Sequence, residues 1–271
     1  MTDRPATLHE IIAVNLARDF ADEEVGFTGL LTGEAAARFG TGIPLAAMEL
    51  ARQSHAPGLT ILLGGCYHNP DVARLKALPS SEHDALLRDL ECEARMTTYP
   101  GPWVLKRHDV TFGFSSAVQV DRVGNINSVC IGDHARPRVR LVGPILQPEH
   151  MTLFRREYVM MPYHERRNFV EQVDFVSGVG YPGGLAGRRA LGLTEHGPRW
   201  VVTPRCIFDF DRERGAIRVR SIHPGVSAAA LQAATGFDLG PLDGVPTTPL
   251  PTPEELARLR TSVDPKSILA S

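Results

Sequence analysis

The sequence lacks most of the short motifs from which a protein's chemistry is inferred. Its 271 residues contain 4 cysteines, none in a CxxC pair, so neither a dithiol redox motif nor a cysteine zinc site is predicted. Neither GxxxxGK[ST] nor GxSxG occurs, which argues against a P-loop and against a hydrolase nucleophile elbow. The 10 histidines form no HxH or HxxxH pair, so no metal site is predicted.

Long apolar runs and charge of one sign are also lacking. No apolar run approaches the length of a membrane span, and the N-terminus has no signal-peptide pattern, so we expect a cytoplasmic protein with reduced thiols. The formal net charge is −2, so neither nucleic acid nor a membrane is predicted as a partner. The densest basic run is Arg136–Arg140, which is either a solvated face or a patch for a phosphorylated ligand.

Glycine and proline are abundant, at 25 and 21 residues. No repeat or low-complexity run accompanies them, so they indicate many turns in an ordered protein. Hydrophobic residues make up 43% and charged residues 22%, which is ordinary for a globular chain. Because nothing forces a boundary, we expect a single domain over residues 1–271.

Helices and short apolar runs alternate along the chain. A capping box at Thr7–Glu10 predicts a helix to about Glu24, and a second box at Thr252–Glu255 predicts another. Further helices are expected over 45–53 and after Ser227. Strands are expected at Leu59–Leu63, Trp103–Leu105, Ala117–Val120, Ser128–Ile131, Val139–Val142, Tyr158–Met161, Val173–Ser177, Arg199–Thr203, Cys206–Phe210 and Ala216–Ile222. The pattern predicts the α/β class, with an open, mostly parallel sheet flanked by helices.

Glycines gather where predicted strands end, at Gly64-Gly65, Gly124–Asn127 and Ser177–Gly180. Ligands of α/β sheets bind at the carboxyl ends of strands, and glycine there lets a ligand approach the backbone. Each group alone is explained equally well by turn geometry, but the three together favour a binding site.

Several segments, in order and at matching spacing, resemble the β subunit of class I (glutaconate-type) coenzyme A transferases. They are GTGIP (40–44), HAP (55–57), VDRVGNINS (120–128), IGD (131–133), VDFVSG (173–178), VVT (201–203), IFDF (207–210), SIHPG (221–225), TGF (235–237), and PTPEEL (251–256) to VDP (263–265). The resemblance implies a three-layer α/β fold of the CoA-transferase and NagB-like kind, a related α subunit as partner, and an acyl-CoA as ligand. No permanently bound cofactor is implied, because CoA is part of the substrate.

Two positions depart from the family pattern. In the transferases a glutamate follows the first buried strand and attacks the thioester, whereas Gly64 stands at that place here and has no side chain to acylate. The family's glycine-rich loop corresponds to Gly143–Pro148, where one glycine is left.

A branch of the superfamily that lacks the glutamate opens rings in steroid catabolism by hydrolysing a carbon–carbon bond in a CoA thioester. VDFVSGVGY (173–181), LPT (250–252) and VDPKS (263–267) resemble its β subunit. The resemblance implies such a hydrolase, as a heterodimer or an α2β2 heterotetramer, with the general base on the α subunit. The alternatives are a CoA-transferase subunit that moves CoA between carboxylic acids, and a non-catalytic subunit that stabilises an active α subunit.

No catalytic residue is certain on this chain. The candidates for substrate or CoA contact are Gly64, Gly65, Cys66, Tyr67, His68, Asn127 and Asp133. Gly64 and Gly65 offer either backbone donors or space, and Cys66 is either a nucleophile or, more in keeping with the lack of a histidine partner, a structural thiol. Asn125 is expected to serve a turn and His223 to be structural.

Overall fold

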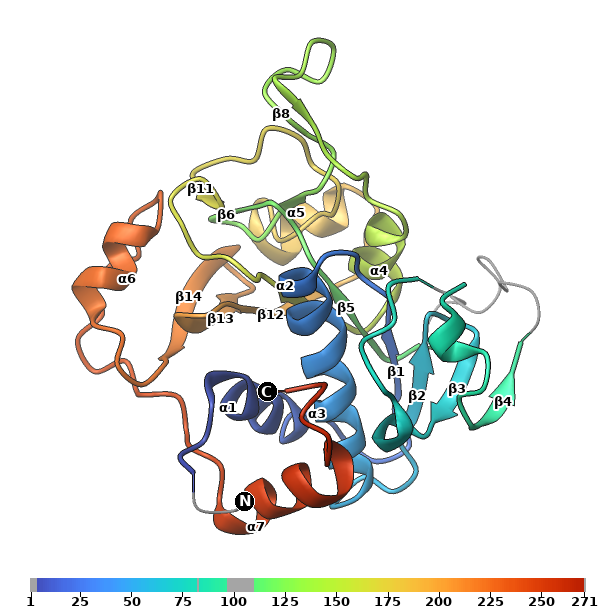
Figure 1. Ribbon diagram of the computed structural model, residues 1–271. Coiled ribbons are helices and arrows are strands. Elements are labelled where there is room, and N and C mark those ends of the chain that lie inside the picture. The colour runs from blue at the N-terminus through green and yellow to red at the C-terminus, as the bar shows by residue number, and fades with distance from the viewer. Residues whose placement is uncertain (1–3, 82, 97–109, 271) are drawn as a thin grey trace. The chain divides into compact units, whose positions relative to one another are not determined.

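The computed structural model describes residues 4–81, 83–96 and 110–270 and divides into two compact units (Figure 1). Unit 1 comprises Met1–Phe114 and Pro249–Ser271, and unit 2 comprises Ser115–Thr248. Along the chain, unit 2 is therefore inserted into unit 1. The strand expected at Trp103–Leu105 lies outside the described residues.

Unit 1 begins with the helix that the first capping box predicts. Thr7 Oγ1 accepts from the Glu10 N–H and the Glu10 carboxylate accepts from the Thr7 N–H, which starts α1 (Leu8–Ala17). The expectation that this helix runs to Glu24 is wrong. Glu23 has a left-handed φ of 61°, which is incompatible with a helix interior, and the next residues form a strand.

That strand, β1 (Val25–Thr28), pairs in parallel with both β2 (Thr60–Leu63) and β5 (Phe112–Ser115). The strands of unit 1 follow the order β5-β1-β2-β3-β4, and β3 and β4 are antiparallel additions. Helix α3 (Ile43–Arg52) packs on β1, β2 and α1. A Cβ at Gly26 would lie 2.5 Å from the Phe112 ring and 2.6 Å from Met48 Sδ, so only glycine permits this close layer. The remaining elements of unit 1 are α2 (Glu34–Ala37), η1 (Arg38–Gly42), β3 (Tyr67–Pro70), η2 (Val72–Arg74), η3 (Ala85–Leu87), β4 (Cys92–Arg95), α7 (Pro253–Arg258) and η5 (Leu259–Val263).

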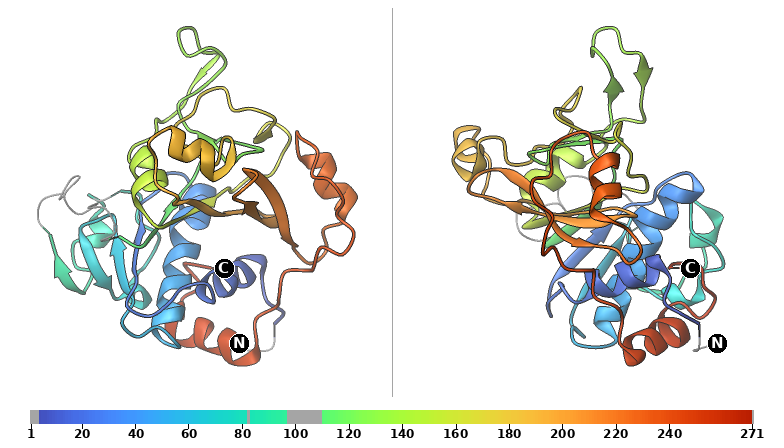
Figure 2. Two further views of the ribbon diagram at one scale, coloured as in Figure 1. Left: turned by 180° about the vertical axis from the view of Figure 1, so that it is seen from behind. Right: turned by 90° about the vertical axis from the view of Figure 1, so that its left-hand side faces the viewer.

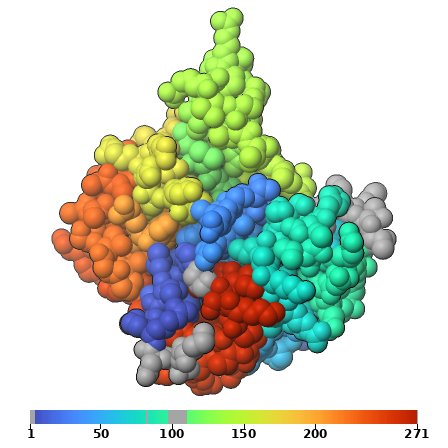
Figure 3. All heavy atoms as spheres, viewed as in Figure 1, coloured from blue at the N-terminus to red at the C-terminus, as the bar shows by residue number. Residues whose placement is uncertain are grey.

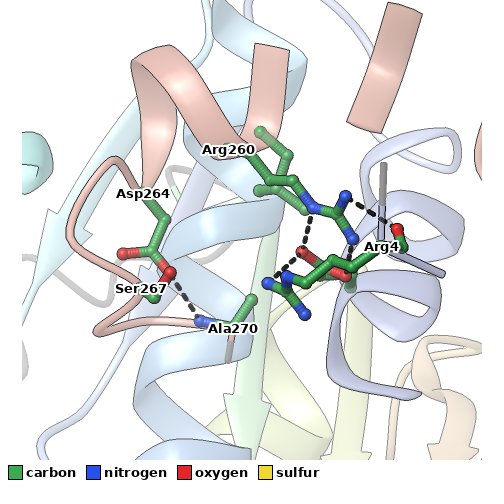
Figure 4. A pocket seen from close by; sticks show the side chains of 7 residues that line it. Arg4, Arg260, Asp264, Ser267 and Ala270 are labelled. Carbon is green, nitrogen blue, oxygen red and sulfur yellow. Dashed lines mark hydrogen bonds and ion pairs between the residues drawn. The ribbon is translucent and has the colours of Figure 1, made fainter. Parts of the chain in front are cut away.

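An ion-pair clasp joins the two chain segments of unit 1 beside a small polar pocket (Figure 4). Arg260 Nε and Nη2 donate to the two oxygens of Glu10 at 2.7 and 2.8 Å, and Arg4 Nη2 donates at 3.0 Å. Glu10 is 2% exposed. Burial alone would raise the pKa of Glu10, but the hydrogen bonds from Arg260 and Thr7 hold it below its usual value. The clasp fixes residues close to both ends of the chain.

Unit 2 contains parallel and antiparallel strands. β10 (Arg156–Met160) and β12 (Gly197–Val202) are parallel, and β13 and β14 continue from β12 as an antiparallel meander. Unit 2 also contains two smaller ladders, one of which projects from the unit as a hairpin (Figure 2). The other elements of unit 2 are β6 (Gln119–Asp121), β7 (Ile126–Asn127), β8 (Cys130–Ile131), β9 (Val139–Arg140), α4 (Gln147–Leu153), β11 (Phe169–Val170), α5 (Gly184–Ala190), β13 (Cys206–Asp211), β14 (Ala216–Ile222) and α6 (Ala228–Ala234).

The predicted class, an α/β fold whose mostly parallel sheet is flanked by helices, is confirmed, with antiparallel strands added in each unit. The strand expected at Val173–Ser177 is wrong. Its backbone bonds largely to side chains, since the Asp174 N–H donates to Gln119 Oε1 at 3.1 Å and the Val173 N–H to Asp121 Oδ2 at 3.5 Å. Only Gly178 forms an isolated bridge, to Ile126.

Two buried histidines organise the polar interior of unit 2. His164 bonds through Nδ1 to Thr203 Oγ1 and through Nε2 to Thr235 Oγ1, at 2.9 and 3.0 Å. His223 bonds to Thr248 Oγ1 and to the Thr203 carbonyl, both at 2.9 Å. Burial lowers the pKa of His164 to about 3 and that of His223 to about 4, so both rings are neutral at physiological pH.

Replacing Glu10 by glutamine should lower the free energy of unfolding by about 3 kcal/mol, because it leaves the largely buried Arg260 guanidinium without its countercharge. Urea denaturation followed by circular dichroism measures this. The matched control is Glu254→Gln, which removes an exposed partner of Arg258 and should cost less than about 0.5 kcal/mol. Equal effects of the two substitutions would contradict a stabilising clasp.

Acid should destabilise the protein through His164 and His223. The pKa of each ring in the folded protein lies below the unfolded value of about 6.5. The contribution of each neutral ring to the free energy of unfolding is therefore complete above that pH and is lost as the pH falls toward 4. At pH 5 each should cost about 2 kcal/mol relative to pH 7. Urea titrations at the two pH values test this. His223→Gln should reduce the acid loss by about half and the exposed control His83→Gln should not; an unchanged loss in His223→Gln would exclude the assignment.

Candidate functional site

Gly64 and Gly65 form the turn of a β-hairpin. They connect β2 to β3, in which Leu63 pairs with Tyr67 in antiparallel register. Their φ angles are 58° and 72°, and the Cys66 N–H donates to the Leu63 carbonyl at 3.2 Å. Two successive left-handed φ angles inside a hydrogen-bonded four-residue turn are typical of a type I′ turn, which favours glycine at both central places. Turn geometry therefore accounts for both glycines.

The Gly64 amide is engaged within unit 1. Its N–H donates to the Thr28 carbonyl at 2.8 Å and so extends the β1–β2 ladder by one bond. Gly64 thus lies immediately beyond a parallel strand pair, at the carboxyl end of β2, where α/β folds place ligand-binding residues.

The next three candidates continue along the same hairpin. Cys66 is half-buried, forms no disulfide with a described residue, and occupies the last position of the turn. Tyr67 is 8% exposed, and the Arg95 guanidinium lies 4.9 Å from its ring centroid. His68 is half-buried and pairs with Leu62 on one side and Ala94 on the other. The structure therefore brings Gly64 to His68 together on one hairpin of unit 1, whereas Asn127 and Asp133 belong to unit 2.

Asn127 is fully buried, and the chain uses all four hydrogen-bonding positions of its amide. Nδ2 donates to Gln119 Oε1 and to the Cys130 carbonyl, both at 2.7 Å. Oδ1 accepts from the Val129 and Cys130 N–H groups at 2.9 and 3.4 Å. This amide holds the chain where β7 passes into β8, and contact with a ligand stays a prediction.

Asp133 lies at the exposed tip of the β8–β9 hairpin. Its Oδ1 accepts from the Ala135 N–H at 2.8 Å, and its carbonyl accepts from the Arg136 N–H at 3.1 Å, so it shapes the turn. The segment Gly143–Pro148 follows this hairpin and leads into α4. Ile145, which is 82% exposed, has a left-handed φ of 39° there, an unfavourable conformation for a β-branched residue.

Asn125 serves the turn between β6 and β7, as predicted. Asp121 accepts from the Asn125 backbone and side chain at 3.0 Å each, and Asn125 Oδ1 accepts from the Gly180 N–H at 2.9 Å. Burial raises the pKa of Asp121, and the hydrogen bonds from Asn125 and the backbone oppose that rise. The same contacts join two of the glycine-rich segments, Gly124–Asn127 and Ser177–Gly180.

Arg188, which the sequence reasoning missed, holds the Ser177–Gly180 segment through hydrogen bonds to its backbone carbonyls. It is fully buried on α5. Its guanidinium donates to the carbonyls of Val179 at 2.8 Å, Gly180 at 2.5 Å, Met151 at 2.9 Å and Thr194 at 2.9 Å. A buried arginine that bonds to backbone carbonyls fixes an irregular segment as a strand ladder would. No sequence pattern marks this role.

A second buried cluster was also missed. Glu157 on β10 is fully buried, and its Oε1 accepts from Ser115 Oγ and lies 3.3 Å from His150 Nδ1. His150 is 5% exposed and stacks on Phe154 at 4.5 Å. The three polar residues are 7 to 42 positions apart in the chain, so no local motif could reveal them.

Metal and membrane sites were sought in the same residues. Across 4–81, 83–96 and 110–270, no three His, Cys, Asp or Glu side chains gather as metal ligands would. Within those ranges no helix has the length and apolar character needed to cross a bilayer.

Arg188→Met should lower the free energy of unfolding by about 3 kcal/mol or more, because four buried carbonyls lose their donor. The neighbouring Arg189 is 60% exposed and pairs with Glu195, so Arg189→Met is a matched control that should cost less than about 1 kcal/mol. Urea unfolding measures both variants, and hydrogen exchange should show the amide of Gly180 losing protection in Arg188→Met only. Equal stability of the two variants would refute the fastening role.

Comparison with known proteins places the chain. No protein-family model matches it. The β subunit of 3-oxoadipate CoA-transferase from Pseudomonas knackmussii is 31% identical over 252 residues, which cover 93% of this chain and 91% of that protein. The cholesterol ring-cleaving hydrolase IpdB subunit of Mycobacterium tuberculosis is 36% identical over 152 residues, covering 56% of this chain and 60% of that protein.

Solved structures agree with these relatives. Glutaconate coenzyme A-transferase from Acidaminococcus fermentans matches with a TM-score of 0.77 and 25% identity, covering 100% of this chain and 98% of that chain. IpdAB from Rhodococcus jostii RHA1 matches with a TM-score of 0.76 and 27% identity, covering 97% and 96%. Similarity to a transferase β subunit extends over nearly the whole length of both proteins. The chain is also similar to the IpdB ring-cleaving hydrolase subunits, and it belongs to the family of CoA-transferase β subunits.

Proposed function

We propose that this chain is the β subunit of a heteromeric hydrolase that opens a ring by cleaving a carbon–carbon bond in a CoA thioester. Its substrate is a steroid-derived or other cyclic compound carried on CoA, and its partner is a family α subunit in a heterodimer or an α2β2 assembly. CoA enters as part of the substrate and not as a bound cofactor.

The observation that carries the proposal is Gly64. By resemblance it occupies the place of the family's nucleophilic glutamate, and it is built into a two-glycine turn whose left-handed φ of 58° suits a residue without a side chain. A glycine cannot form a glutamyl-CoA intermediate, so transfer by the usual covalent route is not open to it.

Hydrolysis of a cyclic β-diketone thioester needs no acyl-enzyme. A general base removes a proton from water, and the hydroxide adds to a ring carbonyl. The carbon–carbon bond then breaks to give a carboxylate and an enolate, which takes up a proton. Backbone or side-chain donors stabilise the oxyanion and the enolate. We place the general base on the α subunit, as the resemblance to the ring-opening hydrolases implies.

The relatives favour two chemistries to different extents. Identity is higher to the IpdB subunit, at 36%, but that match covers 56% of this chain. The 3-oxoadipate CoA-transferase chain matches over 93% at 31% identity, which supports the alternative of CoA transfer between carboxylic acids. Ring-opening hydrolysis and CoA transfer differ in whether this chain forms a covalent adduct with CoA during the reaction.

The test is to co-express the chain with an α subunit of its family, incubate the complex with acetyl-CoA, trap with hydroxylamine or borohydride, and determine the intact mass of this chain. We expect no trapped adduct on the wild-type chain. We also expect no transfer of CoA from acetyl-CoA to labelled acetate, so no labelled acetyl-CoA should form. Gly64→Glu is the matched positive variant, since it restores a carboxylate and should show the adduct mass if the complex assembles. An adduct or acetate exchange in the wild type would overturn the proposal in favour of the transferase.

A further inference from the structure

An exposed hairpin of unit 2 carries the densest basic run of the chain. We call residues 130–140 the basic arm; they comprise β8, the turn at Asp133 and β9. The arm extends away from the remainder of unit 2 in each ribbon view (Figures 1 and 2), and it forms a narrow green projection in the space-filling view (Figure 3). It holds Arg136, Arg138 and Arg140 against one carboxylate, Asp133, in a chain whose formal net charge is −2.

The arm is held by specific contacts at both ends. At its base the Leu141 N–H donates to the Val129 carbonyl at 2.9 Å, and next to the turn the Gly132 N–H donates to Asp174 Oδ2 at 2.9 Å. At its tip the His134 ring stacks on Phe175, with centroids 5.0 Å apart and planes at 27°. The arginines are therefore presented on a hydrogen-bonded hairpin.

The three guanidinium groups are exposed, and none makes a hydrogen bond or ion pair with any residue that the structure describes. Arg218, by contrast, is paired with Asp209 at 2.9 Å. Residues two apart on a strand project to the same side, so Arg138 and Arg140 face one way at a spacing of about 7 Å. Free guanidinium groups on an ordered strand suit phosphate oxygens, to which they donate paired hydrogen bonds.

An aromatic pair at the arm and exposed aliphatic residues next to it in the sequence accompany the charges. The exposed His134 and the half-buried Phe175 form a stacked pair, on which a purine base can stack. Just beyond the arm, Val142 is 87% exposed and Ile145 is 82% exposed.

We propose that the basic arm binds the 3′-phosphoadenosine diphosphate end of the CoA thioester, with Arg136, Arg138 and Arg140 on its phosphates and the His134–Phe175 pair beside its adenine. The inference rests on the proposed function only in taking a CoA thioester as the ligand. A protein surface is the alternative occupant, and the test below includes the outcome that would identify it.

The test uses the co-expressed complex and isothermal titration calorimetry with CoA and with 3′-dephospho-CoA. Arg138→Gln/Arg140→Gln should weaken CoA binding about tenfold or more and should reduce the preference for CoA over 3′-dephospho-CoA. Raising the salt concentration should weaken binding to the wild type more than binding to the variant. The control is Arg167→Gln, a residue 78% exposed and paired with Glu165, which should bind CoA as the wild type does.

Each outcome bears on the proposal. Unchanged CoA affinity in the double variant would overturn it. Loss of the α subunit during purification, with CoA affinity preserved in whatever complex remains, would also overturn it and would identify the arm as a subunit contact. Competition by inorganic phosphate as effective as that by CoA would exclude recognition of the nucleotide. If CoA binds as expected but no ring is opened, the proposed function fails and the arm's assignment stands.

Discussion

The irregular part of unit 2 depends on buried side chains that supply the hydrogen bonds a regular ladder would otherwise provide. Between β6 and α5 the backbone passes through short strands and turns, and each polar group removed from water must find a partner. Asp121, Asn127 and Arg188 supply these partners to successive segments. Because each one serves several backbone groups, the glycine-rich segments are fixed in place although little of their backbone lies in a strand ladder.

This reliance on side chains explains where sequence reasoning failed. Local signals worked well: both capping boxes were correct, and most predicted strands of unit 2 occur. Val173–Ser177 has the apolar pattern of a strand, but Gln119 and Asp121 take its backbone donors. Those partners lie about 50 positions away, so no window along the sequence could include them. The length of α1 failed for a local reason, the left-handed turn at Glu23.

The candidate site, like the fold, was predicted from the sequence only in part. The sequence placed Gly64 to His68 at a strand end, and the structure puts them on one hairpin. What periodicity could not distinguish was a turn that needs glycine from a backbone opened for a ligand, since both require the same residue. The type I′ geometry gives Gly64 a structural reason that holds whatever the chemistry. At a position whose φ is left-handed, a residue with a side chain is conformationally strained. Glycine in place of glutamate therefore also removes strain from the fold.

The clasp between Glu10 and Arg260 has a consequence for how the protein is made. Its two partners are separated by the whole of unit 2, so a ribosome completes residues 115–248 before it makes Arg260. Until then the Glu10 carboxylate, in the first turn of α1, lacks its ion pair with Arg260. Unit 2 can therefore complete its own core during synthesis, while the final packing of unit 1 waits for the last few residues of the chain.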